Sequence, residues 1–288
     1  MIDTHTQHLL DTTQLVAWAL QEDAPHGDIT SEAFVQPDAL GHATITAKAA
    51  GVFFGGPIIA TFQTLVPNVV FTLHVADGDA VVSGQSLLSM TGSFPALLGI
   101  ERVLLNLLQR FCGIASMTNK YIKALSDPKI QVMETRKTTP LWRRWEKAAV
   151  AAGGGTNHRN DLSDMVLIKE NHLSHLQQTQ RFGELTQLLK ECRQKFPDKK
   201  IEIEVETLEQ VQTFPLELVD IVMFDNFSIY DIGKGAQILR SRGLKLPIEV
   251  SGNVTLSTIE QYRGLPIQRI SVGALTHSVV ALDLSMRF

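Results

Sequence analysis

Residues 201–206 read IEIEVE, and this run decides between two arrangements of strands and helices. Its strict alternation is typical of a β-strand and places Glu202, Glu204 and Glu206 on one face, opposite the apolar residues. In an open sheet covered by helices on both faces, this acidic row would be buried at a cost of several kcal/mol per unpaired ion. The mouth of a barrel of parallel strands can accommodate the row, so the run favours a barrel.

Five more β-branched runs alternate with stretches of helical periodicity. They lie near residues 129–133, 165–169, 218–224, 247–251 and 268–272. A series of βα units indicates either a barrel ringed by helices or an open doubly wound sheet. Together with the acidic run, these strands predict an α/β barrel in the second part of the chain.

The first part of the chain has a different pattern. Apolar residues recur at helical spacing in residues 14–21, and period-two alternation follows in residues 43–53 and 69–75. A long helical stretch begins at Leu97 and keeps apolar residues at helical spacing to Phe111. This change of pattern predicts a small sheet-rich unit, followed by a helix that connects it to the barrel.

Composition restricts the classes of function. Of 288 residues, 44% are hydrophobic and 19% are charged, as in ordinary globular proteins, and the net charge is -4. A net negative chain is a poor nucleic-acid binder, so an anion site must be built from local cations. Cys112 and Cys192 form no CxxC pattern, which argues against a zinc site or a disulfide framework.

The first ten residues and the longest apolar run of the chain bear on its location in the cell. The start of the chain, MIDTHTQHLL, contains no Lys or Arg, unlike the basic start of a secretory signal. The longest apolar run, residues 52–62, is broken by glycine and proline and is too short to cross a bilayer. We therefore expect a cytoplasmic protein that binds neither membrane nor nucleic acid.

Two groups of residues suit anion binding, and the first of them directly follows a predicted strand. In ETRKTTP, residues 134–140, Arg136 offers a fork for a carboxylate or phosphate and Lys137 a point charge, although a solvated basic loop is the alternative. In GGGTNHR, residues 153–159, glycines allow close approach of an anion but also end helices. His158 has no second ligand at helical spacing, so anion contact or a structural role is favoured over metal ligation.

Lys169 ends the apolar run MVLIK and has three interpretations. It is a fixed cation for an anionic substrate, a Schiff-base amine as in aldolase-type barrels, or an exposed lysine. More informative is the set of charged, polar or glycine residues at successive strand ends, the face where barrel enzymes build their sites. This set comprises Arg136, Lys137, Lys169, Glu204, Asp225, Ser251 and Gly273. Cations opposite carboxylates suit a phosphorylated sugar, with the carboxylates binding hydroxyls or magnesium.

The longest motifs are ETRKTTP, GGGTNHR, LSDMVLIKENH, VSGNVTL and ISVGALTHSVVALDLSMRF. In this order they closely resemble the quinolinate phosphoribosyltransferases, also called carboxylating nicotinate-nucleotide pyrophosphorylases. The likeness extends upstream through LQEDAPHGDIT and IERVLLNLLQRFCGIAS and covers nearly the whole chain.

The resemblance implies a fold and a reaction. The fold is an incomplete α/β barrel carrying the active site, residues 116–274, and an N-terminal α/β sandwich-like domain, residues 1–115, completed by about residues 275–288. The reaction is magnesium-dependent synthesis of nicotinate mononucleotide, pyrophosphate and CO2 from quinolinate and phosphoribosyl pyrophosphate, in de novo NAD biosynthesis. The resemblance also implies a homodimer.

Matched motif by motif, the resemblance assigns three groups of site residues. The cations for quinolinate are Arg136, His158, Arg159 and Lys169, with Arg102 supplied by the neighbouring subunit. Lys137, Glu204 and Asp225 are catalytic, and the two acids also bind the ribose hydroxyls and magnesium. Ser251, Gly252, Gly273 and His277 line the phosphate end.

This chain departs from the family pattern at two positions. The family usually has glycine where this chain has Leu141, which precedes the segment WRRW at residues 142–145, and commonly has glycine where this chain has Asp161. Both positions lie in loops or at helix starts, so they bear on loop conformation more than on chemistry.

Other functions fit part of the pattern. A nicotinate-specific enzyme has only one carboxylate to recognise, so the number of cations argues against it. A molybdenum-transport-associated relative of the same fold differs in its counterparts of NHR and KENH. An aldolase built on Lys169 and an inactive scaffold that binds phosphoribosyl pyrophosphate are other classes of protein, which intact motifs disfavour.

Overall fold

The computed structural model describes residues 12–288, so the expectation drawn from MIDTHTQHLL lies outside the described residues. The chain forms two compact units. The first comprises the described residues up to Met117, residues 140–154 and residues 279–288, and the second comprises residues 118–139 and 155–278. Within residues 12–288, no helix combines the length and apolar character that a membrane crossing needs. The domain limits at residues 115, 116 and 274 stay a prediction.

The first unit contains a four-stranded antiparallel sheet with the order β12-β1-β5-β3, and a separate pair of strands, β2 and β4. Its helices are α1 (Thr12–Asp23), α2 (Ile29–Phe34), α3 (Gly56–Leu65), the first part of α4 (Phe94–Leu125) and α5 (Arg143–Ala152). Its strands are β1 (Leu40–Ala47), β2 (Gly51–Val52), β3 (Val69–Leu73), β4 (Ala80–Val81), β5 (Ser86–Ser93) and β12 (Leu284–Arg287). The expected sheet-rich unit is therefore present.

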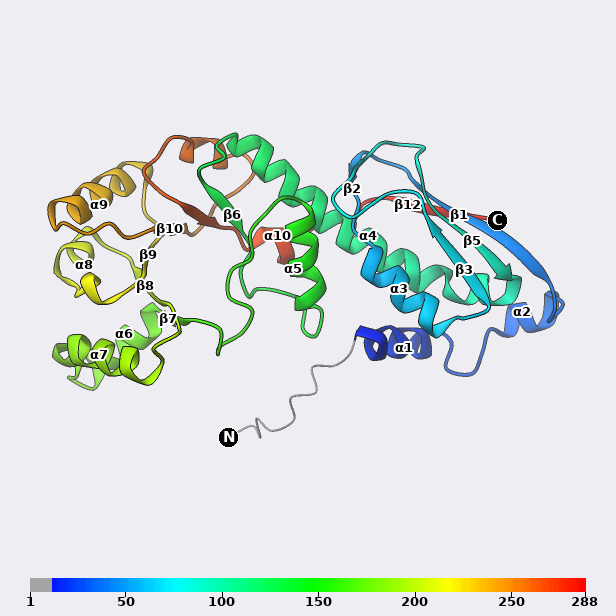
Figure 1. Ribbon diagram of the computed structural model, residues 1–288, viewed down its shortest axis with the longest axis horizontal. Coiled ribbons are helices and arrows are strands. Elements are labelled where there is room, and N and C mark those ends of the chain that lie inside the picture. The colour runs from blue at the N-terminus through cyan, green and yellow to red at the C-terminus, as the bar shows by residue number, and fades with distance from the viewer. Residues whose placement is uncertain (1–11) are drawn as a thin grey trace. The chain divides into compact units, whose positions relative to one another are not determined.

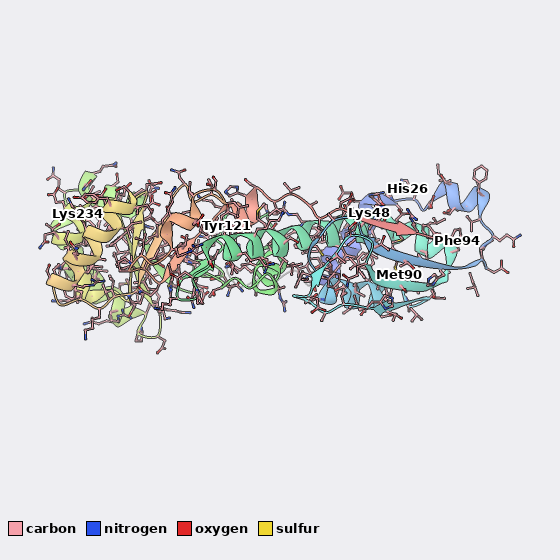
Figure 2. The ribbon with its side chains drawn as sticks, turned by 90° about the horizontal axis from the view of Figure 1, so that it is seen from above. His26, Lys48, Met90, Phe94, Tyr121 and Lys234 are labelled. Carbon is pink, nitrogen blue, oxygen red and sulfur yellow. The ribbon has the colours of Figure 1, made fainter. Side chains whose placement is uncertain are left out.

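The C-terminal residues fold with this first unit. Strand β12 pairs antiparallel with β1, so that Arg287 lies opposite Thr44. Met90 of β5 is fully buried, and Figure 2 labels it together with Phe94, which begins α4. The ring of Phe94 meets the ring of Phe288 edge-on at 5.3 Å. The C-terminal strand thus completes the antiparallel sheet of the first unit.

The second unit contains a six-stranded parallel sheet with the order β6-β11-β10-β9-β8-β7. Its strands are β6 (Gln131–Met133), β7 (Val166–Ile168), β8 (Ile201–Val205), β9 (Ile221–Asp225), β10 (Ile248–Ser251) and β11 (Arg269–Ser271). Its helices are the last part of α4, α6 (Glu170–Gln178), α7 (Leu185–Lys195), α8 (Leu208–Thr213), α9 (Ile229–Ser241) and α10 (Ala274–His277), with 3-10 turns at Phe182–Glu184, Leu216–Leu218 and Ile259–Tyr262. All the strands expected in this part of the chain are present.

The parallel sheet curves into an incomplete barrel. Strands β6 and β7 are its two edges, and helices α6, α7, α8 and α9 lie outside strands β7 to β10 (Figure 1). In a flat sheet β8 and β10, which flank β9, would be about 9.6 Å apart. Nevertheless, side-chain oxygens of Glu202 on β8 and Glu249 on β10 lie within 4.8 Å of each other. The structure confirms the predicted incomplete α/β barrel.

The alternation of IEIEVE sets the two faces of β8. Its apolar residues, on the opposite face from its acids, are fully buried. Glu202 is also fully buried and Glu204 is 5% exposed, whereas Glu206, beyond the strand, is exposed. The expectation that a barrel mouth would host all three carboxylates is wrong for Glu202. This side chain comes earlier in the strand than Glu204 and therefore lies deeper in the barrel.

The departure at Leu141 has a conformational consequence. Leu141 has φ +70°, in the left-handed region where glycine is favoured, and its side chain is 61% exposed. The next residue, Trp142, stacks on Phe111 at 5.6 Å, and Trp145 meets the same ring edge-on at 5.5 Å. The turn at Leu141 thus leads the chain into an aromatic cluster within the first unit.

The departure at Asp161 is explained by a turn. Asp161 is not among the residues of positive φ. Its Oδ1 accepts hydrogen bonds from the backbone N–H and the hydroxyl of Ser163, at 2.7 and 2.5 Å. These bonds lower the pKa of Asp161, with the bond from the hydroxyl contributing most. An Asx turn therefore takes the place of a glycine in this loop.

We predict that Leu141→Gly stabilises the protein. Relief of left-handed strain at a non-glycine residue is worth about 1–2 kcal/mol, and the greater freedom of glycine in the unfolded chain offsets about half of it. The expected net gain is about 0.5–1 kcal/mol, measured as a higher urea midpoint. Leu162→Gly is the control, because Leu162 is 72% exposed and lacks positive φ. Equal destabilisation by both substitutions would contradict the account.

Candidate active site

A cavity of about 280 Å³ lies at the C-terminal ends of the parallel strands in the second unit. This is the end at which α/β barrels carry their active sites. Its wall combines side chains on the concave face of the strands with side chains of the loops that follow them. The lining residues are Thr135, Arg136, Lys137, His158, Arg159, Leu167, Lys169, Met223, Ser251 and Ser271.

Cations dominate one side of this cavity. Nε of Arg136 is buried and has no hydrogen-bonding partner among residues 12–288. Arg159 donates from Nη1 to the carbonyl oxygen of Met165 at 3.1 Å. Burial, and then the neighbouring charge of Arg136, lower the pKa of Arg159 below its usual value. Two guanidinium groups that repel each other in a partly desolvated wall are favourably placed to bind an anion.

The acidic side begins at Glu204. Its Oε2 accepts a hydrogen bond from Nζ of Lys169 at 3.1 Å, and the lysine side chain is 43% exposed. Burial raises the pKa of the Glu204 carboxyl; the bond from Lys169 opposes this rise and the nearby charge of Asp225 adds to it. Glu204 and Asp225 therefore lie close enough to interact, and Lys169 connects the acidic side to the cations.

The ends of β9 and β10 are held by a strained polar turn. Asn226 has φ +56°, and its Nδ2 donates to Oδ2 of Asp225 at 2.7 Å. Its Oδ1 in turn accepts from Nδ2 of Asn253, at 3.1 Å. Gly252 has φ +99°, and a Cβ at this position would lie 2.2 Å from Oδ1 of Asn226. Only glycine fits at residue 252, and the turn fixes the orientation of Asp225.

The loop that carries Lys137 packs against α10. The hydroxyl of Thr276 donates to the carbonyl oxygen of Lys137 at 2.9 Å. A Cβ on Gly273 would meet Nε2 of His277 at 3.0 Å and Cδ of Lys137 at 3.2 Å. The structure thus brings Lys137, Gly273 and His277 together.

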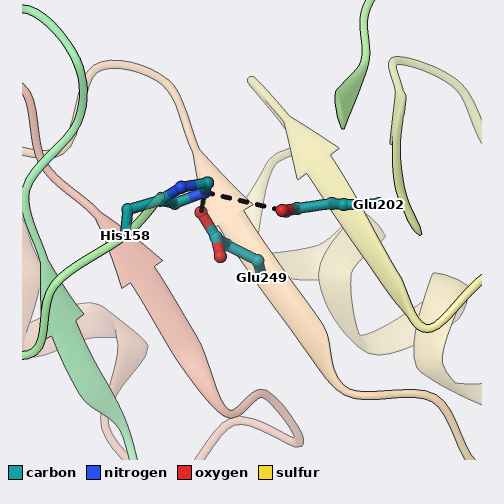
Figure 3. Close-up of side chains that lie close together, drawn as sticks. All are labelled: His158, Glu202 and Glu249. Atoms are coloured by element: carbon teal, nitrogen blue, oxygen red, sulfur yellow. Dashed lines mark ion pairs between the residues drawn. The ribbon is translucent and has the colours of Figure 1, made fainter. Parts of the chain in front are cut away.

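His158 lies deeper, beside two buried acids (Figure 3). Its Nε2 is 3.5 Å from Oε2 of Glu202 and 3.3 Å from Oε1 of Glu249. Its backbone N–H donates to Oε1 of Glu134, at 3.1 Å, and its Nδ1 accepts from the backbone N–H of Arg159, at 2.7 Å. Burial lowers the pKa of His158, but the two carboxylates together outweigh burial and raise the pKa to about 9.

The structure places the predicted site residues in three ways. Arg136, Lys137, His158, Arg159, Lys169 and Ser251 line the cavity. Glu204, Asp225, Gly252, Gly273 and His277 surround it through the contacts described above. Arg102 belongs to the first unit, where it lies exposed on α4, and it is not among the cavity residues.

Two sets of residues could hold a metal ion. Glu204 and Asp225 were predicted to do so. Among the described residues, His158, Glu202 and Glu249 form a second set, with ligand atoms within 4.8 Å of one another. Sequence spacing gave no partner for His158, because both acids reach it from other strands.

Several site residues were missed from the sequence. Ser271 and Met223 line the cavity, and Asn226 orients Asp225. Period-two alternation could have identified Ser271, because it follows Arg269 on the inner face of β11. Asn226 had no such signal, because its importance depends on positive φ and on the neighbouring strand.

Comparisons with known proteins agree with the geometry. The sequence models of the quinolinate phosphoribosyl transferase C-terminal and N-terminal domains match residues 114–287 and 28–112. A probable nicotinate-nucleotide pyrophosphorylase [carboxylating] of Bacillus subtilis is 39% identical over 267 residues, covering 92% of this chain and 89% of that protein.

Solved structures show the same likeness. NadC from Streptococcus pyogenes is 38% identical, with a TM-score of 0.87 over 95% of this chain and 94% of that one. The nicotinate-nucleotide pyrophosphorylase from Francisella tularensis is 32% identical, with a TM-score of 0.85 over 96% of this chain and 95% of that one. Both domain models and relatives of nearly full length therefore show that the chain belongs to the quinolinate phosphoribosyl transferase family.

Proposed function

We propose that the protein is a quinolinate phosphoribosyltransferase, which forms nicotinate mononucleotide, pyrophosphate and CO2 from quinolinate and phosphoribosyl pyrophosphate in de novo NAD biosynthesis. The observation that supports this proposal most directly is the cavity of about 280 Å³, whose lining includes Arg136, Lys137, Arg159 and Lys169. Both substrates are multiply charged anions, so fixed cations are needed to bring them together. The names of the curated relatives, carboxylating nicotinate-nucleotide pyrophosphorylases, support this reaction.

Quinolinate would bind at the cationic side. Its two carboxylates need at least two cationic partners, each an arginine guanidinium or a lysine ammonium group. The buried Nε of Arg136, which has no hydrogen-bonding partner among residues 12–288, supplies one donor. The charges of Arg159 and Arg136 repel each other, and an anion bound between the two side chains would offset this repulsion. Lys169 and His158 complete this side, and the apolar side chains of Leu167 and Met223 can contact the ring.

Phosphoribosyl pyrophosphate would bind at the opposite side. Lys137, Gly273 and His277 lie together and suit a phosphate, with Ser251 and Gly252 at the next strand end. Glu204 and Asp225 would bind the ribose hydroxyls and Mg2+. The fit is chemically sound, because Mg2+ prefers carboxylate oxygens together with substrate phosphates and water. When bound, the ion neutralises charge on the departing pyrophosphate.

The chain's own residues would position the reactants and stabilise charge. The ring nitrogen of quinolinate attacks the anomeric carbon, the bond to pyrophosphate breaks, and positive charge develops on the sugar. The carboxylates of Glu204 and Asp225 stabilise that charge. As CO2 departs, the adjacent positively charged ring nitrogen stabilises the electron pair left at the second carbon, and a proton from solvent then bonds to that carbon to give nicotinate mononucleotide.

An aldolase built on Lys169 is a weaker proposal. A Schiff-base lysine needs a neutral amine, but Nζ of Lys169 donates to the carboxylate of Glu204 at 3.1 Å. The amine is already engaged by a carboxylate, so the contact supports a charge-pairing role over covalent chemistry.

The proposal includes an assembly and a location. We propose a homodimer in which Arg102 enters the site of the neighbouring subunit, supported by the exposure of Arg102 on α4 and by its separation in the sequence from the barrel cations. We also propose a cytoplasmic location, as expected for an enzyme of soluble metabolites.

Quinolinate should be used in preference to nicotinate. A substrate with one carboxylate leaves the partners of the second unpaired, which costs about a hundredfold in kcat/KM. The measurement is Mg2+-dependent release of pyrophosphate and CO2 with each acid. Equal kcat/KM for nicotinate would contradict the proposed function.

The two sides of the site should respond differently to substitution. Asp225→Ala should reduce kcat about a hundredfold and weaken the response to Mg2+, whereas Arg136→Ala should mainly raise the KM for quinolinate, by about tenfold to a hundredfold. Glu209→Ala, on the exposed face of α8, is the control. If Asp225→Ala keeps the wild-type kcat and Mg2+ response, the acidic side is assigned wrongly.

Mixed dimers test the role of Arg102. Arg102→Ala and Lys137→Ala should each be nearly inactive, but a mixed dimer has one site with both residues intact. Random exchange of subunits makes half the dimers mixed, so about a quarter of the wild-type activity should return. Verified exchange without recovery would place Arg102 in its own subunit's site.

A further inference from the structure

Two buried acids in the barrel have no role in the mechanism above. Glu202 and Glu249 are both 0% exposed, and none of their four carboxylate oxygens has a hydrogen-bonding partner of good geometry among residues 12–288. Buried carboxylates without a donor are costly, so their retention needs a reason. The ring nitrogen Nε2 of His158 lies between them, at 3.5 and 3.3 Å (Figure 3).

The other ring nitrogen of His158 has a different environment. Nδ1 accepts from the backbone N–H of Arg159 at 2.7 Å, so in the neutral ring the proton is on Nε2. The two carboxylates favour a second proton on the ring, whereas the Arg159 amide opposes it. In both states Nε2 carries a proton and points it at the acids.

We propose that Glu202 and Glu249 are positioning residues for quinolinate recognition: they hold the Nε2–H of His158 and thereby fix the ring and the adjacent Arg159 in the cavity wall. The arrangement follows from the curvature of the sheet, which brings β8 and β10 to the same ring. His158 then presents one tautomer and one orientation to the cavity. The identity of the substrate rests on the proposed function, whereas the contacts of the His158 ring do not depend on it.

The surroundings of the ring agree with this role. Glu134, which follows β6, accepts the backbone N–H of His158 and so fixes the start of the loop. Arg269 of β11 lies in register with Glu249, and its charge acts on Glu202. The ring is thus held by groups from β8 and β10, and the backbone of His158 is held by Glu134. A proton on Nε2 excludes a metal ion bound through that atom.

Substitutions by methionine and glutamine separate positioning from stability. Glu249→Met removes the acceptor but fills a similar volume, and Glu202 remains 3.5 Å from Nε2 of His158, so the buried ring keeps a carboxylate beside it. Glu249→Gln keeps an acceptor oxygen. The same pair of substitutions at Glu202 provides an independent test, and Glu209→Gln on exposed α8 is the matched surface control.

For Glu249→Met we expect the KM for quinolinate to rise about tenfold, because the ring of His158 and the adjacent Arg159 lose a group that orients them in the cavity wall. The KM for phosphoribosyl pyrophosphate and the melting temperature should change little. Glu249→Gln should recover most of the quinolinate affinity. A purely structural role would instead lower the melting temperature and change both KM values together.

The ring itself gives a readout independent of activity. In protein labelled with 15N at histidine, the His158 signal, identified by its loss in His158→Asn, should show a protonated Nε2 in the wild type. In the methionine variants the Nε2 signal should shift or broaden, because the ring loses one of the two acids beside it, whereas the Arg159 amide still favours the proton on Nε2. An unprotonated Nε2, stoichiometric metal in the purified protein that is lost in Glu249→Met, or unchanged ring signals and quinolinate KM in both methionine variants would each overturn the proposal. If quinolinate is not a substrate at all, the ring signals still decide the geometry.

Discussion

Charge inside a curved parallel sheet is the constraint on which this site depends. The concave face of the barrel holds carboxylates from β8, β9 and β10, and loop cations line the cavity beside them. Buried ions are tolerated only when oppositely charged or hydrogen-bonding groups lie close by. The contacts of Lys169 with Glu204 and of His158 with Glu202 and Glu249 meet this requirement, and they fix the positions of the cations that face an anionic substrate.

The backbone supports this distribution of charge at the strand ends. Asn226 adopts φ +56° and Gly252 φ +99°, and these two residues are packed so closely that a side chain at residue 252 would not fit. The strain is concentrated next to Asp225, whose carboxylate accepts a hydrogen bond from Asn226. Strain of this kind persists only when the surrounding structure enforces it, and here adjacent strands of the sheet provide that enforcement.

Much of the fold could be predicted from the sequence because its signals are local. Alternation in IEIEVE and the β-branched runs identified all the strands of the parallel sheet, and helical periodicity identified α4. The strand-end cations were found because strand ends of a barrel share one face. The fold also places β12 against β1, and the sequence showed this only through the family resemblance, because pairing between distant segments has no local pattern.

The rest of the site could not be predicted because it depends on contacts between strands. Glu249 is one acid between two apolar residues, and only the order and curvature of the sheet bring it to His158. The depth of Glu202 was missed for a similar reason: alternation gives the face of a residue but not its layer in the barrel. The sequence marked residue 141 because the family usually has glycine there, but only the structure showed that Leu141 has positive φ.

The central claim is that paired charges in the second unit form a site for a dianionic pyridine. The most direct test is a crystal structure of the protein with quinolinate bound. We predict that quinolinate occupies the cavity of about 280 Å³, with its carboxylates in contact with Arg136 and Arg159. Ordered quinolinate bound elsewhere, with this cavity empty and both arginines free of substrate contacts, would contradict the account.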